Sequence, residues 1–205
     1  TRITIFADIK NKIEIRTNSG SYDLMGKQKE EFPTTPKIEE KNKISIQGSI
    51  FKEIINSTLF AVSRDDLKPS LTGVLFRFND SGLTAVATDG HRLAKYTSSV
   101  DYDSDLSIII PRKCILEINR ILGSFTDNKE TLAELYVNNN SITFILNDYV
   151  LISKLIEGNY PNFNKVIPQE TKSKIVIDRS ILKNSLNIIS KVVNQQYKGV
   201  KLTPS

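Results

Sequence analysis

The 205-residue sequence has few of the side chains that most often carry catalytic or metal chemistry. It has one cysteine, Cys114, and one histidine, His91, so it can form no internal disulfide and has too few ligands for a structural zinc site. A single cysteine also favours the reducing cytoplasm. We therefore expect a cytoplasmic protein that needs no metal and no cofactor.

Long apolar runs and nucleotide-binding motifs are also absent from the sequence. No run approaches the roughly 18 apolar residues that span a membrane, so we expect no membrane association. Neither the G-x-x-x-x-G-K-[ST] nor the G-x-G-x-x-G phosphate-binding motif occurs, and no G-x-S-x-G motif marks a nucleophilic serine. His91 has no evident second group for general-base catalysis, which makes an enzyme the least favoured class.

What remains is the composition of an ordinary globular protein. Hydrophobic residues make up 39% and charged residues 25% of the chain, enough apolar side chains for a real core. The length allows one or two domains. The net charge of +5 makes an anionic partner plausible, although charge alone is weak evidence.

The clearest local pattern lies between residues 71 and 97. Alternating apolar and polar side chains predict a strand over 83–88. Asp89-Gly90 then predicts a two-residue turn, because glycine tolerates a positive φ. Residues 91–96 predict the returning strand of a hairpin.

The pattern around this hairpin occurs twice. Residues 43–46 predict a strand, the apolar spacing over 51–62 predicts an amphipathic helix, and three strands follow up to residue 97. A second strand, helix and three strands follow over 107–155. The sequence therefore predicts an α+β fold of repeated β-α-β-β-β units, with the helices on one side of antiparallel sheets.

Sequence matches at a longer period extend this repeat to both ends of the chain. The pattern K-I-x-I-x-x-S-I-x-K begins at Lys43 and again at Lys174, 131 residues later, where it predicts another opening strand. Ile13 lies 129 residues before Ile142 in a similar strand-turn-strand pattern. Periods of this length indicate repeated domains, because solenoid repeats are only 20–50 residues long.

These matches predict three segments. Residues 1–42 are expected to be the end of one domain plus a linker, 43–168 a complete domain, and 169–205 the start of a third. We therefore expect this sequence to be a fragment of a longer protein.

Basic residues concentrate in and beside the three predicted helices, which together carry +7 while the whole chain carries +5. One basic helix face is usually only solvated, but three equivalent ones favour a common surface for a polyanion. No helix-turn-helix, zinc finger or aromatic stacking platform accompanies them. A stand-alone, non-specific nucleic-acid-binding domain is therefore an open alternative.

Four sequence strings resemble the bacterial DNA polymerase sliding clamp, the β subunit of DNA polymerase III. They are ATDGHRLA at 87–94, IPRK at 110–113, LIEGNYPNF at 155–163 and VIP at 166–168, and the resemblance covers essentially the whole chain. It implies the DNA-clamp fold and two subunits that close head to tail as a homodimeric ring around duplex DNA. It also implies a non-catalytic processivity factor that tethers the polymerase catalytic subunit, the clamp loader and other proteins carrying clamp-binding peptides.

The resemblance also implies two sets of site residues. The partner-peptide pocket would have an apolar floor and a glycine whose missing Cβ leaves room for a peptide: Leu71, Thr88, Gly90, His91, Arg92, Leu93, Pro161, Lys165 and Val166. Lys165 stands where the family often has arginine. DNA phosphates would be held, without base reading, by Lys52, Arg64, Arg112, Lys113, Arg179, Lys183 and Lys198.

Overall fold

The structure is a computed structural model that describes residues 2–32, 34, 43–100, 102, 104–125, 131–170, 173–194 and 199–203. By its internal contacts the chain divides into two units, Thr1–Tyr160 and Pro161–Ser205, and each is described by itself. None of the helices in the described part is long and apolar enough to cross a membrane.

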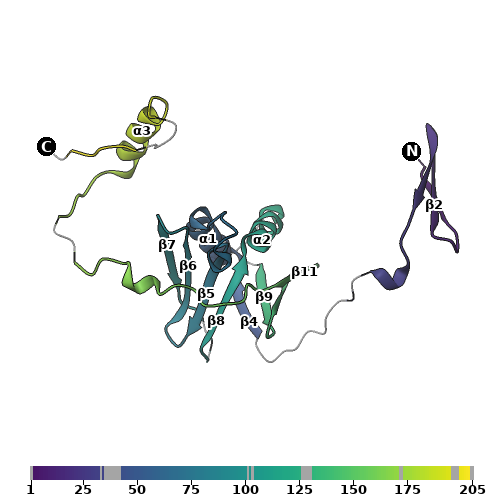
Figure 1. Cartoon of the computed structure of the whole chain (residues 1–205), viewed down its shortest axis with the longest axis horizontal. Coiled ribbons are helices and arrows are strands. Elements are labelled where there is room, and N and C mark those ends of the chain that lie inside the picture. The colour runs from purple at the N-terminus through teal and green to yellow at the C-terminus, as the bar shows by residue number, and fades with distance from the viewer. Residues whose placement is uncertain are drawn as a thin grey trace. The chain divides into compact units, whose positions relative to one another are not determined.

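The first unit contains antiparallel sheets and two helices (Figure 1). One sheet has the order β1-β2-β3, with strands Thr4–Ala7, Lys12–Thr17 and Gly20–Met25. A second has the order β11-β10-β9-β4, with strands Tyr149–Lys154, Ser141–Leu146, Leu132–Val137 and Lys43–Gln47. A third has the order β7-β6-β5-β8, with strands Leu93–Ser98, Gly82–Thr88, Gly73–Asn79 and Leu106–Pro111.

Two helices cover one side of the two four-stranded sheets. They are α1, Gly48–Thr58, and α2, Arg112–Ser124, which contact each other and lie side by side in Figure 1. The second unit contains α3, Arg179–Ile189. The predicted α+β fold, with helices on one side of antiparallel sheets, is confirmed.

The apolar stripe of α1 joins the two four-stranded sheets. Phe51 is fully buried, and its ring lies edge-on to Phe76 of β5 at 6.0 Å and stacks with Phe144 of β10 at 5.9 Å between ring centroids. Thr58 is the polar exception on the buried face, and its hydroxyl donates to the Ile54 carbonyl at 2.7 Å. One helix therefore packs against both sheets and fixes the layer that carries the basic residues.

The strand registers repeat along the chain as the sequence pattern predicts. Ile13 pairs with Leu24 between β2 and β3, and Ile142 pairs with Ser153 between β10 and β11, a shift of 129 for both partners. The span of α3 is that of α1 shifted by 131 residues. The structure therefore repeats its elements at the expected period, while the predicted domain boundaries at 42/43 and 168/169 stay predictions.

One predicted strand does not form. Residues 173–178 contain no strand, and Ile175, Val176 and Ile177 are each more than half exposed. The corresponding strand β4 pairs with β9, which follows it by more than 80 residues. Because a strand needs a hydrogen-bonded neighbour, sequence similarity to β4 is not enough to form one in the second unit.

Candidate functional site

The connection between β6 and β7 is longer than the sequence predicts. Thr88 pairs with Leu93, so the turn has four residues, Asp89 to Arg92, and β7 begins at Leu93. The predicted two-residue turn and a strand start at His91 are therefore wrong. Side-chain hydrogen bonds account for the difference, because they satisfy backbone groups that a tighter hairpin would pair across the ladder.

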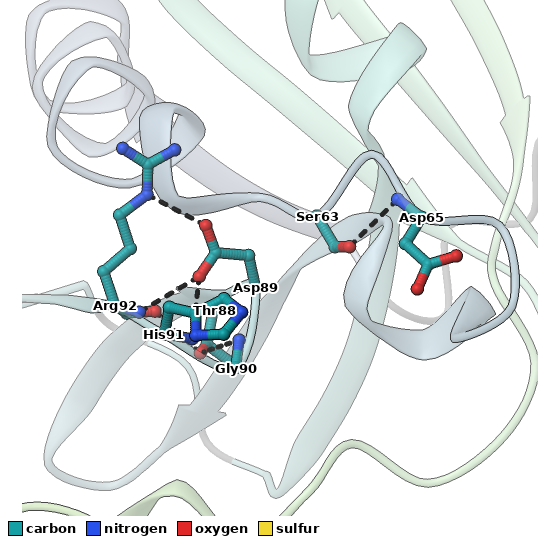
Figure 2. A network of polar contacts seen from close by, with 7 residues as sticks. All are labelled: Ser63, Asp65, Thr88, Asp89, Gly90, His91 and Arg92. Carbon is teal, nitrogen blue, oxygen red and sulfur yellow. Dashed lines mark hydrogen bonds and ion pairs between the residues drawn. The ribbon is translucent and has the colours of Figure 1, made fainter. Parts of the chain in front are cut away.

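Asp89 is the centre of these hydrogen bonds (Figure 2). Its Oδ1 accepts from the backbone N–H groups of His91 and Arg92, both at 3.0 Å, and its Oδ2 accepts from Arg92 Nε, also at 3.0 Å. The Thr88 hydroxyl donates to the Arg92 carbonyl at 2.7 Å and accepts from the Gly90 N–H at 3.1 Å. The turn is thus held by the two side chains that precede Gly90.

These contacts stabilise the charged form of Asp89. The backbone N–H groups of Arg92 and His91, with a smaller effect from the Arg92 guanidinium, lower the pKa of Asp89 from 3.8 to about 2. The carboxylate is therefore ionised at any pH near neutrality. Its contribution to folding is fully present above about pH 4 and is lost as the pH falls towards 2.

We expect the substitution Asp89→Asn to remove this acid-sensitive stability. The amide oxygen of the introduced asparagine can still accept the two backbone N–H groups, but the amide does not titrate. In urea unfolding between pH 6 and pH 2.5, the native protein should lose about 1 kcal/mol more stability than the variant. Carboxyl NMR should show Asp89 titrating near 2, and titration near 3.8 would contradict this account of the turn.

Gly90 has the backbone geometry and the open surroundings that a peptide-facing residue requires. Its φ is +92°, and a Cβ added to it would have no described heavy atom within 4 Å. The positive φ explains why glycine occupies this position of the turn. The free space means that a ligand backbone can approach this side of the turn.

Leu71 and Tyr160 lie beside the same end of the third sheet. Leu71 is buried in a short 3₁₀ helix, Pro69–Leu71, and its carbonyl accepts from the Ser63 N–H at 3.0 Å. Burial raises the pKa of the Tyr160 hydroxyl to about 12, against the opposing effect of the nearby Thr88 backbone N–H, although no hydrogen bond of normal geometry joins them among the described residues. The residue before Pro161 therefore ends close to Thr88.

The remaining residues of the expected peptide pocket lie in the second unit. Pro161, Lys165 and Val166 are exposed there, with Val166 69% exposed. Leu93 is half-buried at the start of β7, and His91 and Arg92 are exposed in the turn. The convergence of Leu71, Leu93, Pro161 and Val166 in one cleft stays a prediction.

The expected DNA-binding residues fall on two separate units. Lys52 lies on α1, Arg64 follows it in an exposed loop, and Arg112 and Lys113 begin α2. Arg179 and Lys183 are exposed on α3 in the second unit, and Lys198 lies outside the described residues. A common surface for these cations stays a prediction.

A cavity that no sequence pattern predicts lies beside the turn. It has a volume of about 500 Å³, and its lining includes Phe60, Arg64, Asp89, Arg92 and Arg112. The three arginines come from the loop after α1, the β6–β7 turn and the start of α2. Because they are far apart in sequence, only the packing of these three segments could reveal their grouping.

Comparisons with known proteins agree with this fold. Residues 45–162 match the family described as the DNA polymerase III beta subunit, central domain. The beta sliding clamp of Bacillus subtilis is 34% identical over 166 residues, 80% of this chain and 43% of the relative. That of Rickettsia bellii is 33% identical over 197 residues, 94% of this chain and 51% of the relative. The chain therefore spans about half the length of these curated relatives.

Solved structures give the same result. The DNA polymerase sliding clamp of Bacillus subtilis superposes with a TM-score of 0.83 at 29% identity, over 95% of this chain and 50% of the other. A Pseudomonas aeruginosa sliding clamp bound to griselimycin gives a TM-score of 0.79 at 27% identity, over 96% of this chain and 52% of the other. With its family match covering more than half of its residues, the chain belongs to the DNA polymerase III beta subunit, or sliding clamp, family.

Proposed function

We propose that the protein is a non-catalytic processivity factor of DNA replication in the cytoplasm. Two subunits close into a homodimeric ring around duplex DNA, without sequence specificity. The ring tethers the polymerase catalytic subunit, the clamp loader and other partners through a peptide-binding pocket. The observation that carries the proposal is the match of residues 45–162 to the central domain of the sliding-clamp family.

The helix layer supports the DNA-binding part of the proposal. Lys52, Arg112 and Lys113 belong to the two helices that cover one side of the sheets, and Arg179 and Lys183 belong to the equivalent helix α3. Such cations hold phosphates electrostatically and carry no base specificity. A loose, sequence-blind contact suits a ring that slides, because closure around the duplex supplies the retention.

The β6–β7 turn supports the peptide-binding part. Gly90 is open on its outer side, and Asp89 and Thr88 hold the turn in one conformation before any partner binds. A turn ordered in advance loses less conformational entropy on binding. An extended peptide with glutamine and leucine or phenylalanine side chains is the ligand type we propose for this pocket.

Retention on circular DNA tests the proposed function directly. The intact protein, loaded on a nicked circular plasmid by its clamp loader, should co-elute with the plasmid in gel filtration and leave it after the plasmid is cut. A stand-alone DNA-binding domain would bind circular and linear DNA equally. That result would overturn the ring proposal.

We expect the double substitution Arg112→Ala and Lys113→Ala to weaken binding to a short linear duplex equally for all sequences. Each lost phosphate contact should flatten the slope of log K against log salt by about 0.9. The matched control is Lys95→Ala with Lys154→Ala, which removes the same charge from two strands, β7 and β11, on which both residues are exposed. A changed sequence preference, or an equal effect of the control, would contradict the assigned DNA surface.

A further inference from the structure

The cavity beside the β6–β7 turn combines an apolar wall with a cluster of arginines. Its volume is about 500 Å³, and Leu59 and Phe60 form part of its wall. Arg64, Arg92 and Arg112 reach it from three different segments of the first unit. A cavity of this size lined by three arginines and one aspartate carries a net charge of +2.

Most of this positive charge is uncompensated by the protein. The guanidinium groups of Arg64 and Arg112 make no ion pair or hydrogen bond with any residue that the structure describes. Arg92 uses only its Nε on Asp89, so its Nη1 and Nη2 are left without a partner among the described residues. Its guanidinium lies 5.8 Å from the ring centroid of Phe60, which orients it at the cavity wall.

The one acidic residue in the lining does not neutralise the cluster. Both oxygens of Asp89 already accept hydrogen bonds, Oδ1 from two backbone N–H groups and Oδ2 from Arg92. An entering anion therefore meets a carboxylate whose charge is compensated within the turn. Arg64 and Arg112 remain available for the anion.

The start of α2 adds a second source of positive potential. Arg112 is the first residue of this 13-residue helix, and Pro111 at its N-cap offers no side-chain cap. Within the first turn, which the structure describes completely, no residue is acidic. The partial positive charge of the helix N-terminus is therefore unmatched at the cavity edge.

We propose that this cavity is a discrete phosphate-binding site, with a phosphate of the DNA backbone as its ligand. Arg64 and Arg112 bind the phosphate oxygens through their planar forks, and the terminal nitrogens of Arg92 complete the site. The DNA origin of the phosphate rests on the proposed function, since a ring around duplex DNA brings backbone phosphates to the helix layer. The site is distinct from the partner-peptide pocket, because neither Leu71 nor Leu93 lines the cavity.

Titration with inorganic phosphate tests the site itself. In the intact protein, phosphate added at constant ionic strength should shift the amide NMR signals of His91 and Arg92 until they saturate. The substitutions Arg64→Ala and Arg112→Ala should each weaken this binding about tenfold. Lys95→Ala removes the same charge from an exposed position outside the cavity and should leave it unchanged. Shifts that do not saturate, or that the arginine variants do not alter, would overturn the proposal.

Titration with a short DNA duplex identifies the source of the phosphate. We expect the duplex to shift the same two amide signals and to reduce the apparent affinity for inorganic phosphate. Saturable phosphate binding without competition from the duplex would overturn the DNA origin and assign the site to free phosphate. Retention on circular plasmid is measured separately, so the cavity proposal fails if retention is normal while phosphate does not bind, and the ring proposal fails if retention is absent.

Discussion

Replacement of Phe51 by alanine is expected to lower the free energy of unfolding by about 3–5 kcal/mol, the usual cost of emptying a fully buried phenylalanine site. The ring of Phe51 is 0% exposed and contacts Phe76 and Phe144, which belong to different sheets. Neither sheet can close the space alone, because each is held in place by its own hydrogen-bonded strands. The loss should appear as a lower urea midpoint for the 205-residue chain.

Phe60→Ala is the matched control for this substitution. Phe60 follows the same helix but is 56% exposed, so the same chemical change should cost less than about 1 kcal/mol. Equal effects of the two substitutions would contradict the role of Phe51 as the residue that joins α1 to both sheets. A small effect of Phe51→Ala would have the same meaning.

The strands of the complete repeat are predictable because the sheets bury one face. In β5 and β6, alternating residues such as Phe76, Phe78 and Ala85 point to the core, and this alternation is visible in the sequence. The period near 130 residues is predictable for a similar reason, since equivalent core positions require similar residues. Local burial patterns were therefore sufficient for the fold class.

The failures of prediction have different physical origins. The length of the β6–β7 turn depends on Asp89 and Thr88, whose side chains take up backbone groups that the dipeptide Asp89-Gly90 alone would pair. The missing strand at 173–178 depends on a pairing partner that local sequence does not supply. The grouping of Arg64, Arg92 and Arg112 depends on packing between distant segments. Each of these features is decided by contacts and not by local propensity.

Leu93→Lys is expected to weaken binding of a polymerase-derived clamp-binding peptide at least a hundredfold. Leu93 is half-buried opposite Thr88 at the start of β7, next to the open side of Gly90. On the proposed apolar floor, a lysine places an unpaired charge beneath the peptide, which costs several kcal/mol. Fluorescence anisotropy of a labelled peptide measures the loss, and retention of the intact protein on circular DNA should not change.

Leu132→Lys is the matched control, because Leu132 is the first residue of β9 as Leu93 is of β7, and it is 45% exposed. It makes the same chemical change outside the proposed pocket and should leave peptide affinity unchanged. Circular dichroism of both variants shows whether they fold. If Leu93→Lys unfolds the protein while Leu132→Lys does not, Leu93 is a core residue of the hairpin and the floor assignment is wrong.

Gly90→Ala tests the same pocket without touching its floor. An added Cβ meets no described heavy atom within 4 Å, so the substitution costs only the strain of a positive φ, about 1 kcal/mol. The methyl group projects into the open space where the peptide backbone is expected to pass. A folded Gly90→Ala variant that binds the peptide as tightly as the native protein would show that the peptide does not pass over this turn. Loss of binding by both Gly90→Ala and a folded Leu93→Lys places the peptide across the turn and the start of β7.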